Sequence, residues 1–520
     1  MLENDMLQPG QHPIERRVKT DTLFLYFSWP LFFAILQVFI FVISFGRTFS
    51  FIHPADSNGL RCGIDNSLLF SNLTDFKNNN YLSYKSKCIS KCDGNPFLSY
   101  CIPTTRKKLR ESPFFFKLVS DFRSYYSFSI FLIILTVVFS FPLSFICAKF
   151  AKFIVYTLIL FVAITTTYFT YQSIRYKAYP ILFDTLFFGL TYLLLLFYIK
   201  RRLNIISPLL TSSFKFLFKA KSILLAPLFL ISLSLLVLLF TILGVLFTNG
   251  VVKYNVKSSI LTQTYSLKTE QHSSLIMTKV LFIFLGIWMI NFLFVLARMS
   301  ISYITSAIYF NHHIPTFSES LSIILTYHSG TVFFGSFVCF MLEALSTFFA
   351  YLQKWLEKTK NSFVKFLLKC ILNVCFILVR FVEEINRISF VYTAIEGVSF
   401  WDGCKKAANL FKIESILSID VLMRNIFFGA RIIVSSLAGI ATYFYVRDMN
   451  LMNPHLAVIF VSLTVYFVLK TIDVVVSTTS QTLLVCMLED AKDEGAYAPA
   501  EVKTIMVWLR ERVGFNSNHA

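Results

Sequence analysis

Ten apolar blocks, each about as long as a membrane-spanning helix, fill most of this 520-residue chain. A helix needs about 20 residues to cross roughly 30 Å of hydrocarbon. The blocks therefore predict an all-α, polytopic membrane protein with about ten transmembrane helices. We expect the spans at residues 23–46, 124–147, 153–173, 181–199, 223–248, 276–310, 331–351, 370–401, 426–446 and 456–486.

The composition excludes a separate soluble domain. Hydrophobic residues make up 56% of the chain and charged residues only 15%, whereas soluble domains carry about a quarter charged residues. The formal net charge of +19 lies mainly at helix ends, a pattern that orients helices and favours anionic lipid. We therefore expect membrane lipids rather than nucleic acid as partners, and the oligomeric state stays open.

One polar loop, residues 47–123, carries two signs of an oxidising compartment. Four cysteines in it predict two disulfides, and three pairings are possible; they are Cys62, Cys88, Cys92 and Cys101. Asn72 begins the glycosylation sequon of the same loop. The loop is therefore predicted to lie outside the cytosol, which places the chain before the first span inside.

These orientations divide the chain into a membrane domain and polar segments. The expected parts are a cytosolic N-terminal tail at 1–22, a transmembrane domain at 23–488, a second outer loop at 249–275, a cytosolic amphipathic segment at 200–222 and a cytosolic C-terminal tail at 489–520. Alternating lysines and apolar residues favour a helix on the bilayer surface for the amphipathic segment.

The span at 370–401 leaves alternatives open. Charged residues interrupt it, and the spacing pairs Arg380 with Glu384 and Glu383 with Arg387, four residues apart. The pattern fits a self-neutralised, partly cytosolic helix end or a helix broken at a central cavity. The five lysines of 352–369 oppose the outer location that ten spans require, so the topology of 352–387 stays undecided.

Five motifs in the same order resemble the choline transporter-like family. They lie at residues 53–63 (HPADSNGLRCG), 88–92 (CISKC), 327–336 (YHSGTVFFGS), 386–397 (NRISFVYTAIEG) and 482–490 (TLLVCMLED). The resemblance implies ten helices, cytosolic chain ends, a disulfide-bearing outer loop and transport of choline or a related amine such as ethanolamine. Three residues depart from the family's pattern: Glu343, Glu396 and Gln481.

A choline-like cation has no N–H to donate, so aromatic faces and a buried carboxylate would have to hold it. The candidate substrate-binding residues are Trp288, Asn291, Phe292, Glu343, Tyr392 and Glu396. The first three share one helix face, although an amide inside a membrane can also bond a neighbouring helix. A lone carboxylate in a span is a functional candidate, or it has a partner on another helix. Asp473 is expected to pair with Lys470.

Other function classes find little support in the sequence. No phosphate-binding glycine loop, zinc-protease motif or serine-hydrolase motif occurs, so we expect no enzyme, no metal and no cofactor. The interpretation is a membrane carrier of choline or a related amine, in the plasma membrane rather than an internal membrane. The alternative is a lipid-moving or structural membrane protein without small-solute transport.

Overall fold

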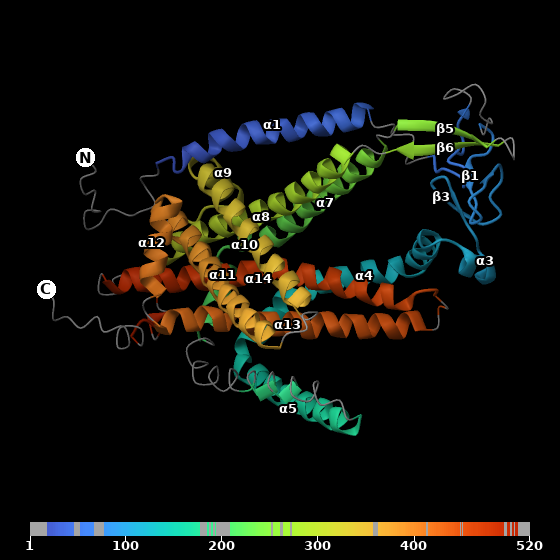
Figure 1. Cartoon of the computed structure of the whole chain (residues 1–520). Helices are drawn as coiled ribbons and strands as arrows, with labels where there is room; N and C mark the ends of the chain where they lie inside the picture. Colours follow the sequence, from blue (N-terminus) through green and yellow to red (C-terminus); the bar gives the residue numbers. More distant parts are fainter. Residues whose placement is uncertain are drawn as a thin grey trace.

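The structure of the chain is a computed structural model (Figure 1). It describes residues 18–45, 53–66, 77–176, 185–186, 189–190, 193, 208–250, 253–259, 264–270, 273–311, 313–356, 362–411, 414–447, 449, 451–492, 497–499, 502–503 and 505–507. The predicted all-α membrane fold is confirmed, with two small sheets added. The expected span at 181–199 and Asn72 lie largely or wholly outside the described residues, so that span and the glycosylation site stay predictions.

Long helices dominate the described part of the chain. They are α1 (Thr22–Phe45), α4 (Phe114–Lys149), α5 (Ala151–Arg175), α7 (Ala226–Gly250), α8 (Ser273–Tyr309), α10 (Ser329–Leu356), α11 (Ser362–Glu396), α13 (Glu414–Arg447) and α14 (Pro454–Lys492). Shorter helices are α3 (Arg106–Glu111), α9 (Phe317–Tyr327), α12 (Phe400–Phe411) and the 3-10 helix η2 (Lys221–Leu225).

Six segments of the described chain are long and apolar enough to cross a membrane. They are Phe116–Ser140, Lys221–Thr248, Leu275–Tyr309, Ser329–Leu356, Phe427–Arg447 and Pro454–Ala491. Helices α1, α5 and α11 also cover predicted spans. The number of ten spans therefore stays a prediction.

Two small sheets lie at one end of the bundle, opposite α12 and the start of α1 (Figure 1). One has the strand order β2-β1-β4-β3, with β1 (Tyr81–Leu82), β2 (Cys88–Ile89), β3 (Asn95–Phe97) and β4 (Tyr100–Ile102). The other is an antiparallel hairpin of β5 (Lys253–Ser259) and β6 (Thr264–Glu270). This hairpin lies within the polar loop predicted at 249–275, and the outer location of that loop stays a prediction.

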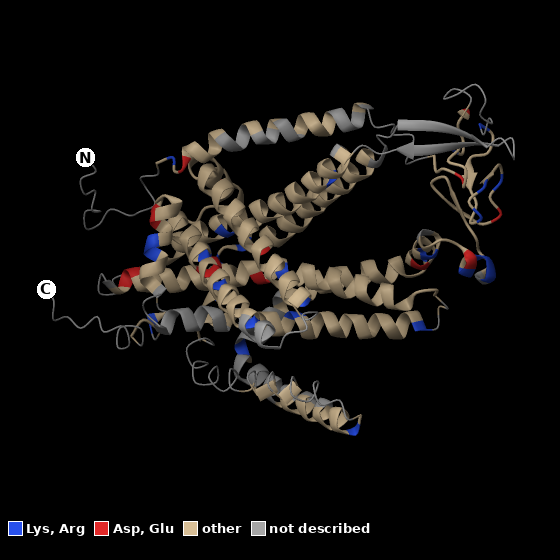
Figure 2. Cartoon of the chain, viewed as in Figure 1, with Lys and Arg blue, Asp and Glu red and all other residues tan. Residues whose placement is uncertain are grey.

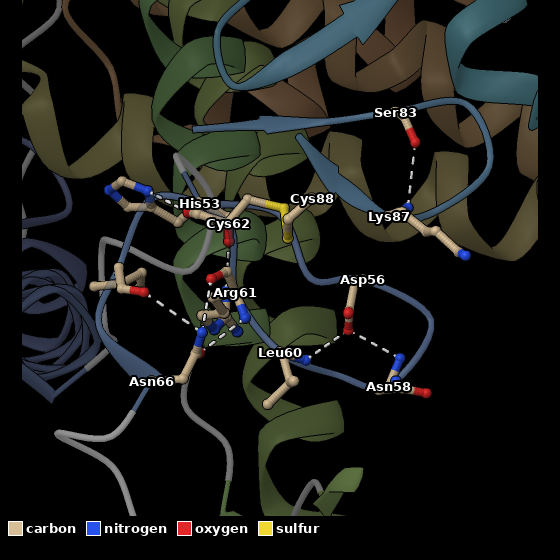
Figure 3. The surroundings of a disulfide bond; sticks show 11 residues. His53, Asp56, Asn58, Leu60, Arg61, Cys62, Asn66, Ser83, Lys87 and Cys88 are labelled. Carbon is tan, nitrogen blue, oxygen red and sulfur yellow. Dashed lines mark hydrogen bonds between the residues drawn. A yellow bond between two sulfur atoms is a disulfide. The ribbon is translucent and has the colours of Figure 1, made fainter. Parts of the chain in front are cut away.

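The disulfides join Cys62 to Cys88 and Cys92 to Cys101, which selects one of the three possible pairings. Around the first bond, the Asp56 carboxylate accepts hydrogen bonds from the backbone N–H groups of Asn58 (2.9 Å) and Leu60 (2.8 Å) (Figure 3). These bonds close a tight turn beside the disulfide. The polar loop is therefore cross-linked and internally bonded, which gives it a fixed shape without a large core.

Glycine lets two of the central helices approach closely. A Cβ atom at Gly244 of α7 would lie 2.7 Å from the Phe282 ring of α8, and one at Gly286 of α8 would lie 2.2 Å from the Thr241 hydroxyl. In a bilayer, helix association depends on such close packing because lipid is as apolar as the side chains. These positions therefore fix how α7 and α8 pack against each other.

The largest buried core lies at the α12 end of the bundle. It joins residues from 208–219, α8, α11, α14 and the segment after α14. Leu209, Phe214 and Leu217 are almost fully buried in it, whereas Lys215 and Lys219 are exposed. The apolar face of the helical residues 208–219 therefore contacts protein. Residues 200–207 lie outside the described residues, so the amphipathic segment at 200–222 as a whole stays a prediction.

The segment after α14 also contributes to this core. Val502, Ile505 and Met506 are buried in it, and the backbone N–H of Tyr497 donates to the Asp490 carboxylate (3.1 Å). The sequence predicts a polar cytosolic tail from residue 489. Its described residues instead dock on the bundle.

A second contact closes the same end of the bundle, and we call it the Asp21 latch. The Asp21 carboxylate accepts hydrogen bonds from the Thr331 hydroxyl (2.6 Å) and the Phe400 backbone N–H (2.9 Å). The Thr20 hydroxyl shares hydrogen bonds with the buried His328 ring (2.8 Å) and with Thr331 (2.9 Å). The chain before α1 is thereby tied to the start of α10 and the start of α12.

Candidate functional site

Four helices each carry a polar residue at their midpoint. They are Asn291 on α8, Glu343 on α10, Arg431 on α13 and Asp473 on α14. Figure 2 shows charges of both signs in the middle of the bundle, between long uncharged stretches. Charged groups at this depth of a membrane protein are costly, face the interior or water, and usually have a function or a partner. This midpoint layer is the candidate site.

Asn291 and Glu343 meet in this layer. The Asn291 side-chain amide donates to Glu343 Oε2 at 3.0 Å and also to the carbonyl of Ile287 at 3.3 Å. The Glu343 side chain is exposed, and no basic group of the described residues lies within ion-pair distance of it. A neighbouring helix thus supplies the partner that the sequence left open, and this partner is a neutral amide and not a base.

Aromatic rings line the contact between α8 and α10 beside this pair. Trp288 is 8% exposed and its indole N–H donates to the Ser336 hydroxyl at 3.1 Å. Its ring lies 5.7 Å from that of Phe337, and the Phe292 ring lies 4.7 Å from that of Phe333. The three predicted residues of α8 and Glu343 therefore form one local group.

Asp473 does not pair with Lys470, as the local spacing suggested. It forms an ion pair with Arg431 of α13 at 2.9 Å. The Arg431 guanidinium also lies over the rings of Tyr466 (5.2 Å) and Phe428 (5.7 Å). A guanidinium between two rings and a carboxylate gains both cation–π and Coulomb attraction. This explains why Arg431, and not Lys470, forms the ion pair with Asp473.

Lys470 contacts α8 instead. Its ammonium is over the Phe294 ring of α8 at 5.4 Å. It interacts electrostatically with Glu343 and with three arginines, namely Arg298, Arg387 and Arg431. Lys470 therefore belongs to the group around Glu343 and not to the Arg431–Asp473 pair.

Helix α11 passes the same layer without a break, so the interpretation as a broken helix is wrong. Arg387 pairs with Glu383 at 2.6 Å, as expected, and lies 3.9 Å from Glu384. Arg380 pairs with Glu383 at 3.0 Å and not with Glu384. The charges that interrupt the apolar sequence are thus neutralised mostly along one helix face, and the helix continues to Glu396.

The α11 charges also reach neighbouring helices. Arg298 of α8 interacts electrostatically with Arg387, Glu383 and Glu384. The Asn386 amide donates to Cys339 Sγ of α10 at 3.0 Å. The polar layer therefore connects α8, α10 and α11 on one side with α13 and α14 on the other.

Tyr392 and Glu396 lie elsewhere, at the α12 end of α11. The Tyr392 hydroxyl donates to Glu489 at 3.0 Å, its side chain is 2% exposed, and Glu396 forms an ion pair with Lys406 of α12. Tyr392 belongs to the core cluster that contains Ile304 of α8. Ile304 is separated from Trp288 by about 24 Å along the helix, at roughly 1.5 Å per residue. The six predicted residues therefore occupy two places and not one.

Local sequence patterns reveal neither Arg431, in the midpoint layer, nor the Asp21 latch, which lies outside that layer. Arg431 lies in an apolar block, but no local spacing rule links it to Asp473. Asp21 stands just before the first span, where a capping carboxylate is common, and its bonds to residues more than 300 positions away leave no local signal.

Comparisons with known proteins agree on one family. A family model described as plasma-membrane choline transporter matches residues 183–492. Choline transporter-like protein 2 of Danio rerio is 28% identical over 200 residues, covering 36% of this chain and 28% of the relative. The Salmo salar protein of the same name is 28% identical over 251 residues, covering 45% and 35%. Choline transporter-like protein 4 of Xenopus laevis is 28% identical over 227 residues, covering 39% and 32%. The matched region thus spans about a third of each relative's length.

Proposed function

This chain belongs to the plasma-membrane choline transporter family, and we propose on that premise that it carries choline or a related amine such as ethanolamine across the bilayer by alternating access. The protein is an integral membrane protein, and we place it in the plasma membrane. The relatives are named for choline transport, and the family match includes all the helices that carry the midpoint layer.

The observation that carries this proposal is the exposed Glu343 carboxylate in the middle of α10, beside an amide and aromatic rings. A quaternary ammonium gains about 0.5–2 kcal/mol from each ring it contacts, and a carboxylate in a low-dielectric site adds Coulomb attraction. In the proposed complex Glu343 is the charge partner, Asn291 bonds the alcohol, and Trp288 and Phe292 are aromatic walls.

Tyr392 and Glu396 are assigned to a later stage of transport. They are too far from Trp288 to contact the same small cation at the same time. Both lie at the end of the bundle that the resemblance places in the cytosol, and both are bonded to other side chains. We assign them to an aromatic wall and a charge partner near the cytosolic exit, used once the Glu489 and Lys406 contacts open.

Uptake of labelled choline into vesicles that contain the purified protein tests the proposal. Wild-type protein should give saturable uptake that unlabelled choline competes away, and Glu343→Gln should raise the KM about tenfold or more, because it removes the charge but keeps the shape. Glu111→Gln is the matched control, since Glu111 is an exposed carboxylate at the end of α3. Equal KM values for Glu343→Gln and wild type would remove Glu343 from the mechanism.

The rival function, lipid movement, gives a different result in the same vesicles. It predicts no saturable amine uptake but headgroup-dependent transfer of labelled lipid between leaflets. Its main motivation was a basic helix on the bilayer surface, and the apolar face of residues 208–219 contacts protein instead. Chemical conversion of choline by the purified protein would contradict our expectation that it is not an enzyme.

A further inference from the structure

We infer that Lys470 is a built-in competitor for the substrate cation, and that its ammonium acts on Glu343 when the site holds no substrate. This inference rests on the proposed function and deepens it, because it assigns the group that the substrate has to displace. It makes Lys470 a residue that sets both substrate affinity and the rate of release.

The first argument is the position of the charge. Lys470 is three residues from Asp473 on α14, the nearest acid in sequence, but Arg431 holds Asp473 at 2.9 Å. Glu343 of α10 is the anion that interacts electrostatically with Lys470, ahead of the cations Arg298, Arg431 and Arg387. Glu343 is therefore its source of attraction.

The second argument is chemical likeness. The Lys470 ammonium lies 5.4 Å from the centre of the Phe294 ring, within the range of a cation–π interaction. Phe294 is three residues from Asn291, which bonds Glu343. A half-buried cation over a ring and near a carboxylate uses the same two forces that would bind a quaternary ammonium, so the two cations compete for one negative charge.

The third argument is that the lysine is held loosely. No direct ion pair joins Lys470 to Glu343, and the described residues give Lys470 no hydrogen bond. The Arg431–Asp473 pair provides the contrast, because Arg431 has a direct ion pair and two ring contacts. Arg431 is therefore fixed in the bundle, whereas the flexible stem of Lys470 lets its ammonium move away when another cation arrives.

The consequence is a tradeoff between binding and release. Repulsion by Lys470 weakens substrate binding, and the return of its ammonium towards Glu343 speeds substrate departure. A variant without this charge should bind choline more tightly but release it more slowly. Both KM and the maximal rate should then fall together, a change that loss of structure alone does not produce.

The experiment compares Lys470→Met, Lys470→Gln and Lys470→Arg in the choline-uptake assay, with choline affinity measured on the same purified samples. We expect Lys470→Met and Lys470→Gln to lower the KM and the Kd about tenfold, the scale of one nearby charge in a partly solvated site, and to lower the maximal rate. Lys470→Arg keeps the charge and should stay within about threefold of wild type in KM.

A double variant separates competition from a structural role. In a Glu343→Gln background, Lys470→Met should leave the KM unchanged, because the charge for which the cations compete is gone. If one neutral variant misfolds, the other carries the test. Unchanged or raised KM values in folded neutral variants would overturn the inference while leaving the proposed function intact. Wild-type protein without saturable choline uptake would overturn the proposed function itself.

Discussion

Replacing Gly330 by alanine should break the Asp21 latch. Gly330 is in the first turn of α10, and a Cβ atom there would lie 2.1 Å from the backbone oxygen of Asp21, 2.6 Å from its carbonyl carbon and 3.0 Å from the backbone oxygen of Thr20. All three atoms are main chain, so no rotamer change relieves the overlap. The segment before α1 would have to move away from α10.

The cost follows from the bonds that this movement breaks. The Thr20 backbone N–H donates to the Tyr327 carbonyl at 2.9 Å, and the Asp21 carboxylate accepts from Thr331 and Phe400. A neutral bond contributes about 1 kcal/mol and a bond to a charged group about 1.5–3 kcal/mol. Alanine returns about 1 kcal/mol through its better helix propensity. The net loss is about 3–6 kcal/mol, if the whole latch opens.

Thermal unfolding of the purified protein in detergent measures this loss. Gly330→Ala should unfold well below wild type, and protease should cut near residue 20 more readily. Gly439→Ala is the matched control: its Cβ atom would meet the Ser462 hydroxyl at 2.4 Å and otherwise nothing closer than 3.4 Å, and that hydroxyl can rotate. Wild-type stability and protease resistance in Gly330→Ala would refute the argument that the latch is closed by backbone contact.

Three further predictions concern stability. Cys88→Ser opens the longer disulfide loop and should cost about 3 kcal/mol, measured by unfolding with and without reductant; equal stability would contradict the assigned cross-link. Arg431→Met should cost about 3–5 kcal/mol by leaving Asp473 uncompensated, and adding Asp473→Leu should recover most of it; a double variant as unstable as the single one would count against the pair. Ile505→Asp, at a buried position, should lower the stability by more than about 2 kcal/mol, whereas Val507→Asp, at an exposed one, should not; equal effects would argue against docking of the tail.

The lengths of the apolar blocks predicted the long helices, because a segment that crosses a bilayer must satisfy its backbone hydrogen bonds within a helix. For the same reason α11 stays helical through Glu383 and Arg387, where the charge pattern suggested a break. Ion pairs along one face neutralise the charges. Keeping the helical backbone hydrogen bonds costs less free energy than leaving backbone N–H and C=O groups unbonded in the membrane.

Partners on distant helices could not be predicted, because spacing rules describe only one helix. Glu343 was recognised as an expensive carboxylate, but nothing near it in sequence names Asn291, which lies 52 positions away. Local spacing pairs Asp473 with the nearest base, Lys470, whereas the structure pairs it with Arg431 of α13. Polar and apolar residues alternate in much of 253–259 and 264–270, a pattern typical of β-strands. The β5–β6 hairpin could therefore have been predicted from polarity, although not from the length of the apolar blocks.

The docked segment at 502–506 has a consequence for how the protein is made. It completes a core whose other members begin at Leu209. This core therefore remains incomplete during synthesis until residues 502–506 have been added. Insertion of the helices and completion of this core are thereby separated in time. A chain whose synthesis stopped within α14 would leave the apolar side chains of this core without the partners that Val502, Ile505 and Met506 provide.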